Sequence, residues 1–90
     1  MSACLDKFGR VVSVGSRVRL IELAPQFLAS LPLDEVEYVR SMIGDIFDVY
    51  EIDDYGSAWI EKCWNFADDG QRMGHSLALE SHEMELINAN

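Results

Sequence analysis

The sequence predicts a mainly β fold, in which short antiparallel strands close into a small barrel and a helical insert separates the first strand from the second. Two observations predict this class. From Gly44 onward, short runs rich in aromatic and β-branched residues alternate with clusters of turn-forming residues. Residues 25–43 instead place their apolar side chains at helical intervals. The 90 residues are expected to form one domain, residues 1–90, around one core.

The first strand is expected within residues 17–23. Val18 and Leu20 alternate there with Arg17 and Arg19, which is typical of a half-buried strand with one basic face. Residues 21–23 break the alternation, so the strand either carries a bulge near Leu20 or has its end covered on both sides.

The helical insert is expected over about residues 25–43. A single helical turn follows Pro25, and a longer helix starts at Pro32, with Asp34 and Glu35 in its first turn and Gly44 at its end. This helix is expected to cover one open end of the barrel. The alternative is a dimer interface. The apolar stripe of the predicted helix consists of Leu33, Val36, Val39, Met42 and Ile43.

The remaining strands are expected as a central hairpin and two short strands. Residues 46–52 and 58–64 flank a turn at 53–56, and their imperfect alternation indicates that both faces are partly covered. A polar loop over 65–74, with Asp68-Asp69-Gly70 as its turn, is expected next. A strand at 75–79, a tight turn at 80–83 and a closing strand at 84–87 complete the prediction.

The net charge of −9 is distributed unevenly along the chain. Residues 1–19 carry +3, whereas the other 71 residues carry −12. An acidic surface repels a phosphate backbone, so we expect no direct nucleic-acid binding and favour a basic or neutral protein partner. The alternative is that the acidic residues only keep the surface well solvated.

The sequence predicts a cytoplasmic, soluble protein without a membrane partner. Its apolar runs are far shorter than the roughly 20 residues that span a bilayer, and its first residues lack the layout of a signal peptide. Cys4 and Cys63 belong to no zinc-binding spacing. Two reduced thiols, with Cys63 partly buried in a strand, are therefore the expected state, and a disulfide is the alternative.

Three segments carry a resemblance to a known family: residues 14–19, Met42-Ile43-Gly44, and residues 77–87. Their order resembles that of small bacterial SH3-like barrel proteins, a barrel type shared with ribosomal KOW domains, and covers about residues 8–87. The resemblance implies a five-stranded antiparallel barrel. The chain has neither an ALYDY-type segment nor a paired tryptophan, which argues against polyproline recognition, and its acidic loops argue against a KOW-like RNA role.

One cluster of residues is predicted to bind a protein partner. Aromatic residues lie in or beside the central hairpin, two carboxylates lie at its turn, and rings with carboxylates attract a cationic side chain. The alternative is that the rings are core or edge packing. The predicted binding residues are Tyr50, Asp53, Asp54, Tyr55, Trp59 and Trp64.

No residue pattern predicts catalysis, a metal site or a cofactor. His75, His82 and Glu83 match no metal-ligand spacing, and Ser76 beside His75 would point to the opposite face of a strand. The favoured function is therefore a non-catalytic protein-interaction module, as a monomer or a homodimer. The alternatives are an acidic decoy that inhibits a nucleic-acid-binding protein, and a small enzyme subunit.

Overall fold

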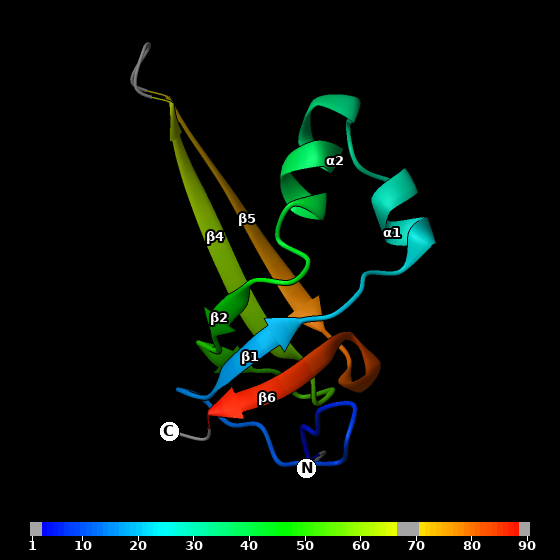
Figure 1. The fold of residues 1–90 in the computed structure, drawn as a ribbon, viewed down its shortest axis with the longest axis vertical. Coiled ribbons are helices and arrows are strands. Elements are labelled where there is room, and N and C mark those ends of the chain that lie inside the picture. The colour runs from blue at the N-terminus through cyan, green and yellow to red at the C-terminus, as the bar shows by residue number, and fades with distance from the viewer. Residues whose placement is uncertain (1–2, 67–70, 89–90) are drawn as a thin grey trace.

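The computed structural model describes residues 3–66 and 71–88, which form six strands and two α-helices (Figure 1). In chain order the elements are β1 (Arg17–Leu20), α1 (Pro25–Ala29), α2 (Leu33–Arg40), β2 (Ile46–Asp48), β3 (Glu51–Ile52), β4 (Ala58–Phe66), β5 (Gln71–Leu79), a 3-10 turn (Ser81–Glu83) and β6 (Met84–Asn88).

The strands form two separate antiparallel sheets, so the predicted five-stranded SH3-like barrel is wrong. The strand orders are β2-β1-β6 and β3-β4-β5. The predicted strand 46–52 breaks in two, because the Val49 N–H donates to the Ser16 carbonyl at 2.9 Å while the next residue, Tyr50, donates to the Trp59 carbonyl at 3.0 Å. The chain thus passes from one sheet to the other, and within the described residues β5 and β6 do not pair to close a barrel.

The strands β4 and β5 form a long hairpin that extends well past β1, β2 and β6, up to the level of α2 (Figure 1). Their pairing continues without interruption from Ala58↔Leu79 to Phe66↔Gln71. The polar loop predicted over 65–74 is therefore mostly strand, because hydrogen bonding across the hairpin outweighs the polarity of these residues. The predicted turn at residues 68–70 lies outside the described residues.

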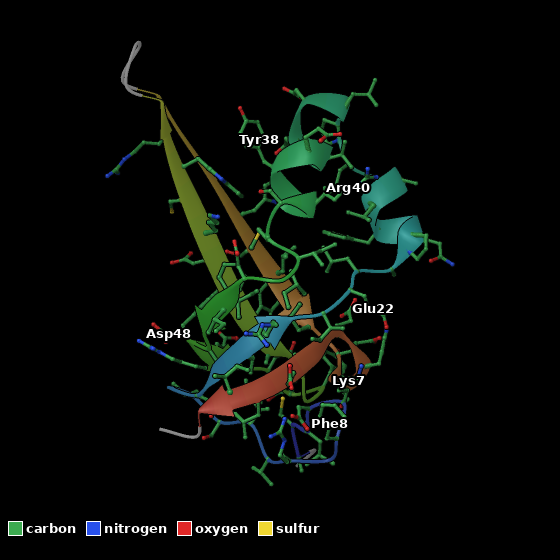
Figure 2. All side chains as sticks on the ribbon, in the orientation of Figure 1. Lys7, Phe8, Glu22, Tyr38, Arg40 and Asp48 are labelled. Atoms are coloured by element: carbon green, nitrogen blue, oxygen red, sulfur yellow. The ribbon has the colours of Figure 1, made fainter. Side chains whose placement is uncertain are left out.

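Helices α1 and α2 lie within the predicted helical insert, beside the β4–β5 hairpin (Figures 1 and 2). The Tyr38 ring contacts the Trp64 ring edge-on at 5.5 Å between centroids, and Glu35 Oε1 lies 2.9 Å from His75 Nε2. The predicted apolar stripe is only partly buried, since Val39 is fully buried and Leu33 is 90% exposed. The apolar stripe is therefore buried only toward the C-terminal end of α2, and the helix does not cover the end of a barrel. Among the described residues no helix is long and apolar enough to cross a membrane.

The core lies around β1, which is the middle strand of its sheet. Val18 and Leu20 are fully buried, as their alternation predicts. The predicted basic face is paired with acidic neighbours, because Arg17 Nε lies 3.2 Å from Asp48 and Arg19 lies 3.4 Å from Glu85. β1 ends at Leu20, before the residues that break the alternation, so the bulge predicted near Leu20 is wrong. The register of β1 against β6 shifts instead between Arg17 and Val18.

A short N-terminal hairpin covers the outer edge of β6 (Figures 1 and 2). Its anchor is the buried Asp6 carboxylate, which accepts hydrogen bonds from the N–H groups of Phe8 at 2.9 Å, Arg10 at 2.8 Å and Leu86 at 2.7 Å, and also pairs with the Arg10 guanidinium at 2.8 Å. Burial alone would raise the pKa of Asp6, but these hydrogen bonds outweigh it and lower the pKa below its ordinary value.

The two cysteines are free thiols, so the alternative of a disulfide is wrong. Cys4 is buried, and burial together with the negative charge of Asp53 raises the pKa of its thiol. Cys63 is exposed rather than partly buried. It projects from β4 opposite Gly74 of β5, where the absence of a side chain leaves its sulfur uncovered.

Candidate functional site

The two tryptophans of the predicted binding cluster lie on opposite faces of β4. Successive residues of a strand point to opposite faces, and Trp59 and Trp64 are an odd number of residues apart. Trp64 faces α2, where it contacts Tyr38 and carries the Lys62 ammonium 5.4 Å from its ring centroid. Trp64 therefore packs between helix and hairpin and is separated from the other predicted residues.

Asp53 holds Trp59 in place. Asp53 Oδ1 accepts hydrogen bonds from the N–H groups of Tyr55 at 3.0 Å and Ser57 at 2.9 Å, and Oδ2 accepts one from the indole N–H of Trp59 at 3.0 Å. These bonds, first from Ser57 and then from Trp59, lower the pKa of Asp53. The carboxylate orders the β3–β4 turn and fixes the Trp59 ring. The structure therefore brings the predicted residues Asp53 and Trp59 together, with Asp53 holding the indole ring in position.

The indole N–H resonance of Trp59 is expected to titrate with Asp53, with a midpoint below the ordinary aspartate value of about 3.9. A lowered pKa means that the bond is intact above that value and is lost only as the pH falls through the lower pKa of the folded state. An NMR titration checks this. The Asp53→Asn variant should lose the titration and the exposed Asp54→Asn variant should keep it, whereas a midpoint at or above about 3.9 would contradict the arrangement.

The other predicted residues are open to solvent at the same end of the hairpin. Tyr55 is 89% exposed and Tyr50 is 43% exposed, and Asp54 is exposed as well. None of these three lines either of the two best-formed pockets in the described part of the chain. They remain predicted contacts rather than parts of a formed cage.

The outer edge of β5 carries a second candidate site, which is defined by backbone groups. The backbone of Trp59 faces β3, because its carbonyl accepts the hydrogen bond from Tyr50. In an antiparallel sheet, consecutive residues turn their N–H and C=O groups to opposite edges, so the groups of Ile60 face β5. Ile60 pairs with Leu77, whose backbone groups therefore face β4.

It follows that the alternate residues of β5, Gly74, Ser76 and Ala78, turn their N–H and C=O groups away from the sheet. β5 is the last strand in the order β3-β4-β5, and no strand among the described residues pairs with its outer side. We call these backbone groups of Gly74, Ser76 and Ala78 the β5 edge. Such a row of open donors and acceptors is a template for another extended chain.

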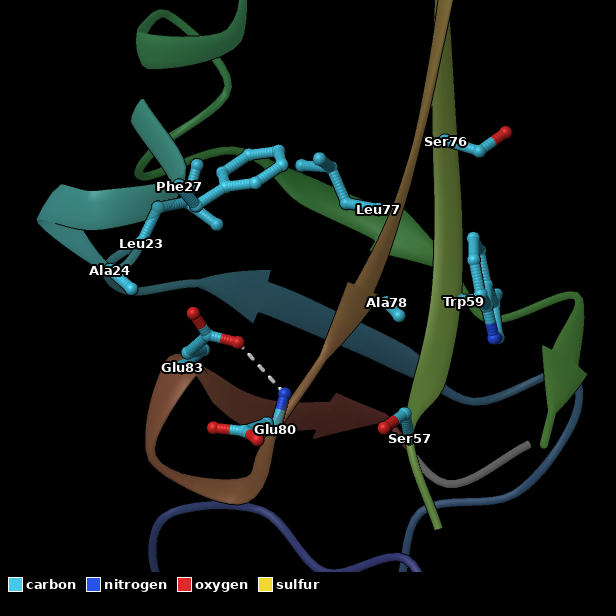
Figure 3. A pocket seen from close by; sticks show the side chains of 10 residues that line it. All are labelled: Leu23, Ala24, Phe27, Ser57, Trp59, Ser76, Leu77, Ala78, Glu80 and Glu83. Atoms are coloured by element: carbon cyan, nitrogen blue, oxygen red, sulfur yellow. Dashed lines mark hydrogen bonds between the residues drawn. The ribbon is translucent and has the colours of Figure 1, made fainter. Parts of the chain in front are cut away.

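A pocket of about 480 Å³ wraps around this edge (Figure 3). On the face of the sheet that packs against the helical insert, the pocket is lined by Leu23, Phe27 and Leu77. On the opposite face it is lined by Trp59, Ser76 and Ala78. Pocket and edge together offer apolar surface to side chains on both faces of an added strand.

One end of the pocket is acidic. Glu80 and Glu83 line it, and no lysine or arginine does. The buried Glu83 carboxylate accepts the N–H of Glu80 at 2.8 Å, which closes the turn after β5 and leaves the Glu80 side chain at the surface. The site therefore favours a partner with a positive charge at this end.

Sequence reasoning pointed to the hairpin turn and missed the β5 edge. Whether a strand lies at an edge depends on the order of strands in the sheet, which local patterns do not contain. One feature of the sequence does agree with an open edge at β5. Residues 73–79 include no lysine, proline or carboxylate, the residues that usually protect an exposed edge.

The residues considered for metal binding and hydrolysis are not brought together. His75 bonds to Glu35 on the inner face of the hairpin, Ser76 points to the other face, and His82 lies 3.8 Å from Glu80. In residues 3–66 and 71–88 no three His, Cys, Asp or Glu side chains are grouped closely enough to hold a metal ion.

Comparison with known proteins adds no assignment, since no protein-family model, no curated protein and no solved structure matches this chain.

Proposed function

We propose that the chain is a non-catalytic protein-interaction module that accepts an extended segment of a partner along the β5 edge. The observation that carries this proposal is the open row of backbone groups at Gly74, Ser76 and Ala78 beside a pocket with apolar walls. A strand that pairs with an exposed sheet edge gains main-chain hydrogen bonds, and pockets beside the edge select its alternate side chains.

The site favours an extended segment with apolar residues and one basic residue. The apolar side chains would contact Phe27 and Leu23 on one face and the Trp59 ring on the other. The basic residue would lie near Glu80, at the acidic end of the pocket. Trp59 is the predicted binding residue that this proposal retains, and Asp53 supports it by holding the indole ring.

Peptides selected from a random decapeptide library on the immobilised protein should bind at this edge. In ¹⁵N-labelled protein, at a concentration low enough for the chain to be monomeric, the amides of Gly74, Ser76 and Ala78 are expected to gain protection from hydrogen exchange when the selected peptide is added, because they acquire acceptors. The amide of Leu77, already bonded to β4, should change little.

Two variants separate the β5 edge from the hairpin turn. Ser76→Pro removes one outward N–H at an edge position, where proline is tolerated, and should weaken binding of the selected peptide about tenfold. Tyr55→Ala changes an exposed residue outside the pocket and should leave binding unchanged. Loss of binding in Tyr55→Ala with retention in Ser76→Pro would overturn the edge site in favour of the turn.

A further inference from the structure

We infer that the β5 edge pairs with the β5 edge of a second copy of this chain, in an antiparallel arrangement with its two-fold axis at Ser76. This inference rests on the proposed function, since it names the extended partner of the same site. The result is a continuous six-strand sheet formed from two β3-β4-β5 sheets.

The backbone geometry allows this register. In an antiparallel pair, directly opposite residues exchange hydrogen bonds only if both turn their backbone groups toward the partner. With the axis at Ser76, Gly74 lies opposite Ala78 of the second copy and Ser76 lies opposite its own equivalent. The backbone N–H and C=O groups of all these residues point away from their own sheet, so on the order of six backbone hydrogen bonds form at the centre of the interface.

The side chains on the outer face of this interface are small. Opposite residues in a sheet point to the same face. The facing pairs are therefore Gly74 with Ala78 of the second copy, twice, and Ser76 with its equivalent. None of these pairs brings bulky or charged groups together, so the two edges can approach to the normal strand spacing of about 4.8 Å.

Charge complementarity at the ends of the interface fixes the register. The same two-fold axis places Arg72 opposite Glu80 of the second copy at both ends. Glu80 follows β5 directly and its backbone is still extended, with φ −89° and ψ 167°, so it continues the strand to this position. Arg72 is the basic residue of β5. The chain's own strand thus supplies the basic residue that the acidic end of the pocket favours.

One sheet has its outer edge covered by another segment of the chain and the other sheet does not, which supports a partner for β5. The outer edge of β6 is covered by the N-terminal hairpin, where the Lys7 N–H donates to the Met84 carbonyl at 3.0 Å and Asp6 accepts the Leu86 N–H. The β5 edge has no such cover within the described residues. An open strand whose residues 73–79 include no lysine, proline or carboxylate is a site for pairing with another chain.

Charge exchange between two variants tests the inference directly. In Arg72→Glu alone or Glu80→Arg alone, like charges face each other at both ends, and the dimer dissociation constant measured by analytical ultracentrifugation should rise about tenfold or more. An equimolar mixture of the two variants restores opposite charges at both ends of a mixed dimer. The mixture should therefore regain the affinity of the unchanged protein, an outcome that misfolding of either variant would prevent.

The outcomes separate this inference from the proposed function. A monomer at all concentrations that still binds selected peptides at Gly74, Ser76 and Ala78 would overturn the self-pairing and leave the module intact. A dimer that Ser76→Pro and the charge variants do not weaken would also overturn it. A chain that neither dimerises nor binds peptides at this edge would overturn both.

Discussion

Replacement of Asp6 by alanine is expected to lower the free energy of unfolding by about 3 kcal/mol. The carboxylate is buried and accepts the N–H groups of Phe8, Arg10 and Leu86, which would all lose their acceptor at once. Thermal and urea denaturation measure the loss. Asp34→Ala, which removes an exposed carboxylate from the first turn of α2, is the matched control and should change stability by less than about 1 kcal/mol.

The contribution of Asp6 to the free energy of unfolding should also depend on pH. The pKa of Asp6 is lowered in the folded state, so its contribution is complete above the unfolded value of about 3.9 and is lost as the pH falls through the folded pKa. The difference in stability between the unchanged protein and Asp6→Ala should therefore be constant near neutral pH and shrink below about pH 4. A difference that grows as the pH falls would contradict the assigned role.

Replacement of Leu20 by alanine is expected to cost about 3 kcal/mol, while the same replacement at Leu33 should cost less than about 0.5 kcal/mol. Leu20 is fully buried at the end of β1, where its truncation leaves a cavity between packed neighbours. Leu33 is 90% exposed at the start of α2, so its truncation removes little buried apolar surface. Chemical denaturation of the two variants measures both values.

This pair also tests how the helical insert packs. If Leu33→Ala were as destabilising as Leu20→Ala, the whole apolar stripe of α2 would be buried, as the spacing of its residues predicts. The structure instead buries only the part of the stripe around Val39 and Met42. Equal losses would therefore contradict the observed placement of α2.

Local patterns predicted the elements that local physics determines. The alternation of Val18 and Leu20 with two arginines correctly identified a half-buried strand, since side-chain period and burial are linked in a sheet. The helical spacing after Pro25 correctly located the insert. The extent of the apolar stripe was wrong at Leu33, which is 90% exposed, because local spacing does not show which turns of a helix pack against the rest of the chain.

The arrangement of the strands could not be predicted from such patterns. Residues 46–52 have the composition of a single strand, yet Val49 and Tyr50 bond to different sheets. Which strand then lies at an edge depends on these long-range pairings. The barrel prediction was therefore wrong, and the β5 edge was missed.

The candidate binding residues illustrate the same division. The sequence identified Asp53 and Trp59 as neighbours, and they are bonded to each other in the structure. Their grouping with Trp64 was wrong, because an odd spacing along one strand separates two side chains onto opposite faces. The parity rule that was applied to His75 and Ser76 would have revealed this.

The position of β1 between β2 and β6 has a consequence for how the chain folds during synthesis. β1 starts at Arg17, and one of its partners is the strand Met84–Asn88. Its apolar side chains can be enclosed only after that distant strand has left the ribosome, whereas the β4–β5 hairpin needs only neighbouring residues. Contacts between distant segments form slowly. The nascent chain therefore exposes the apolar side chains of β1 until that strand emerges, and exposed apolar strands of this kind are prone to aggregation.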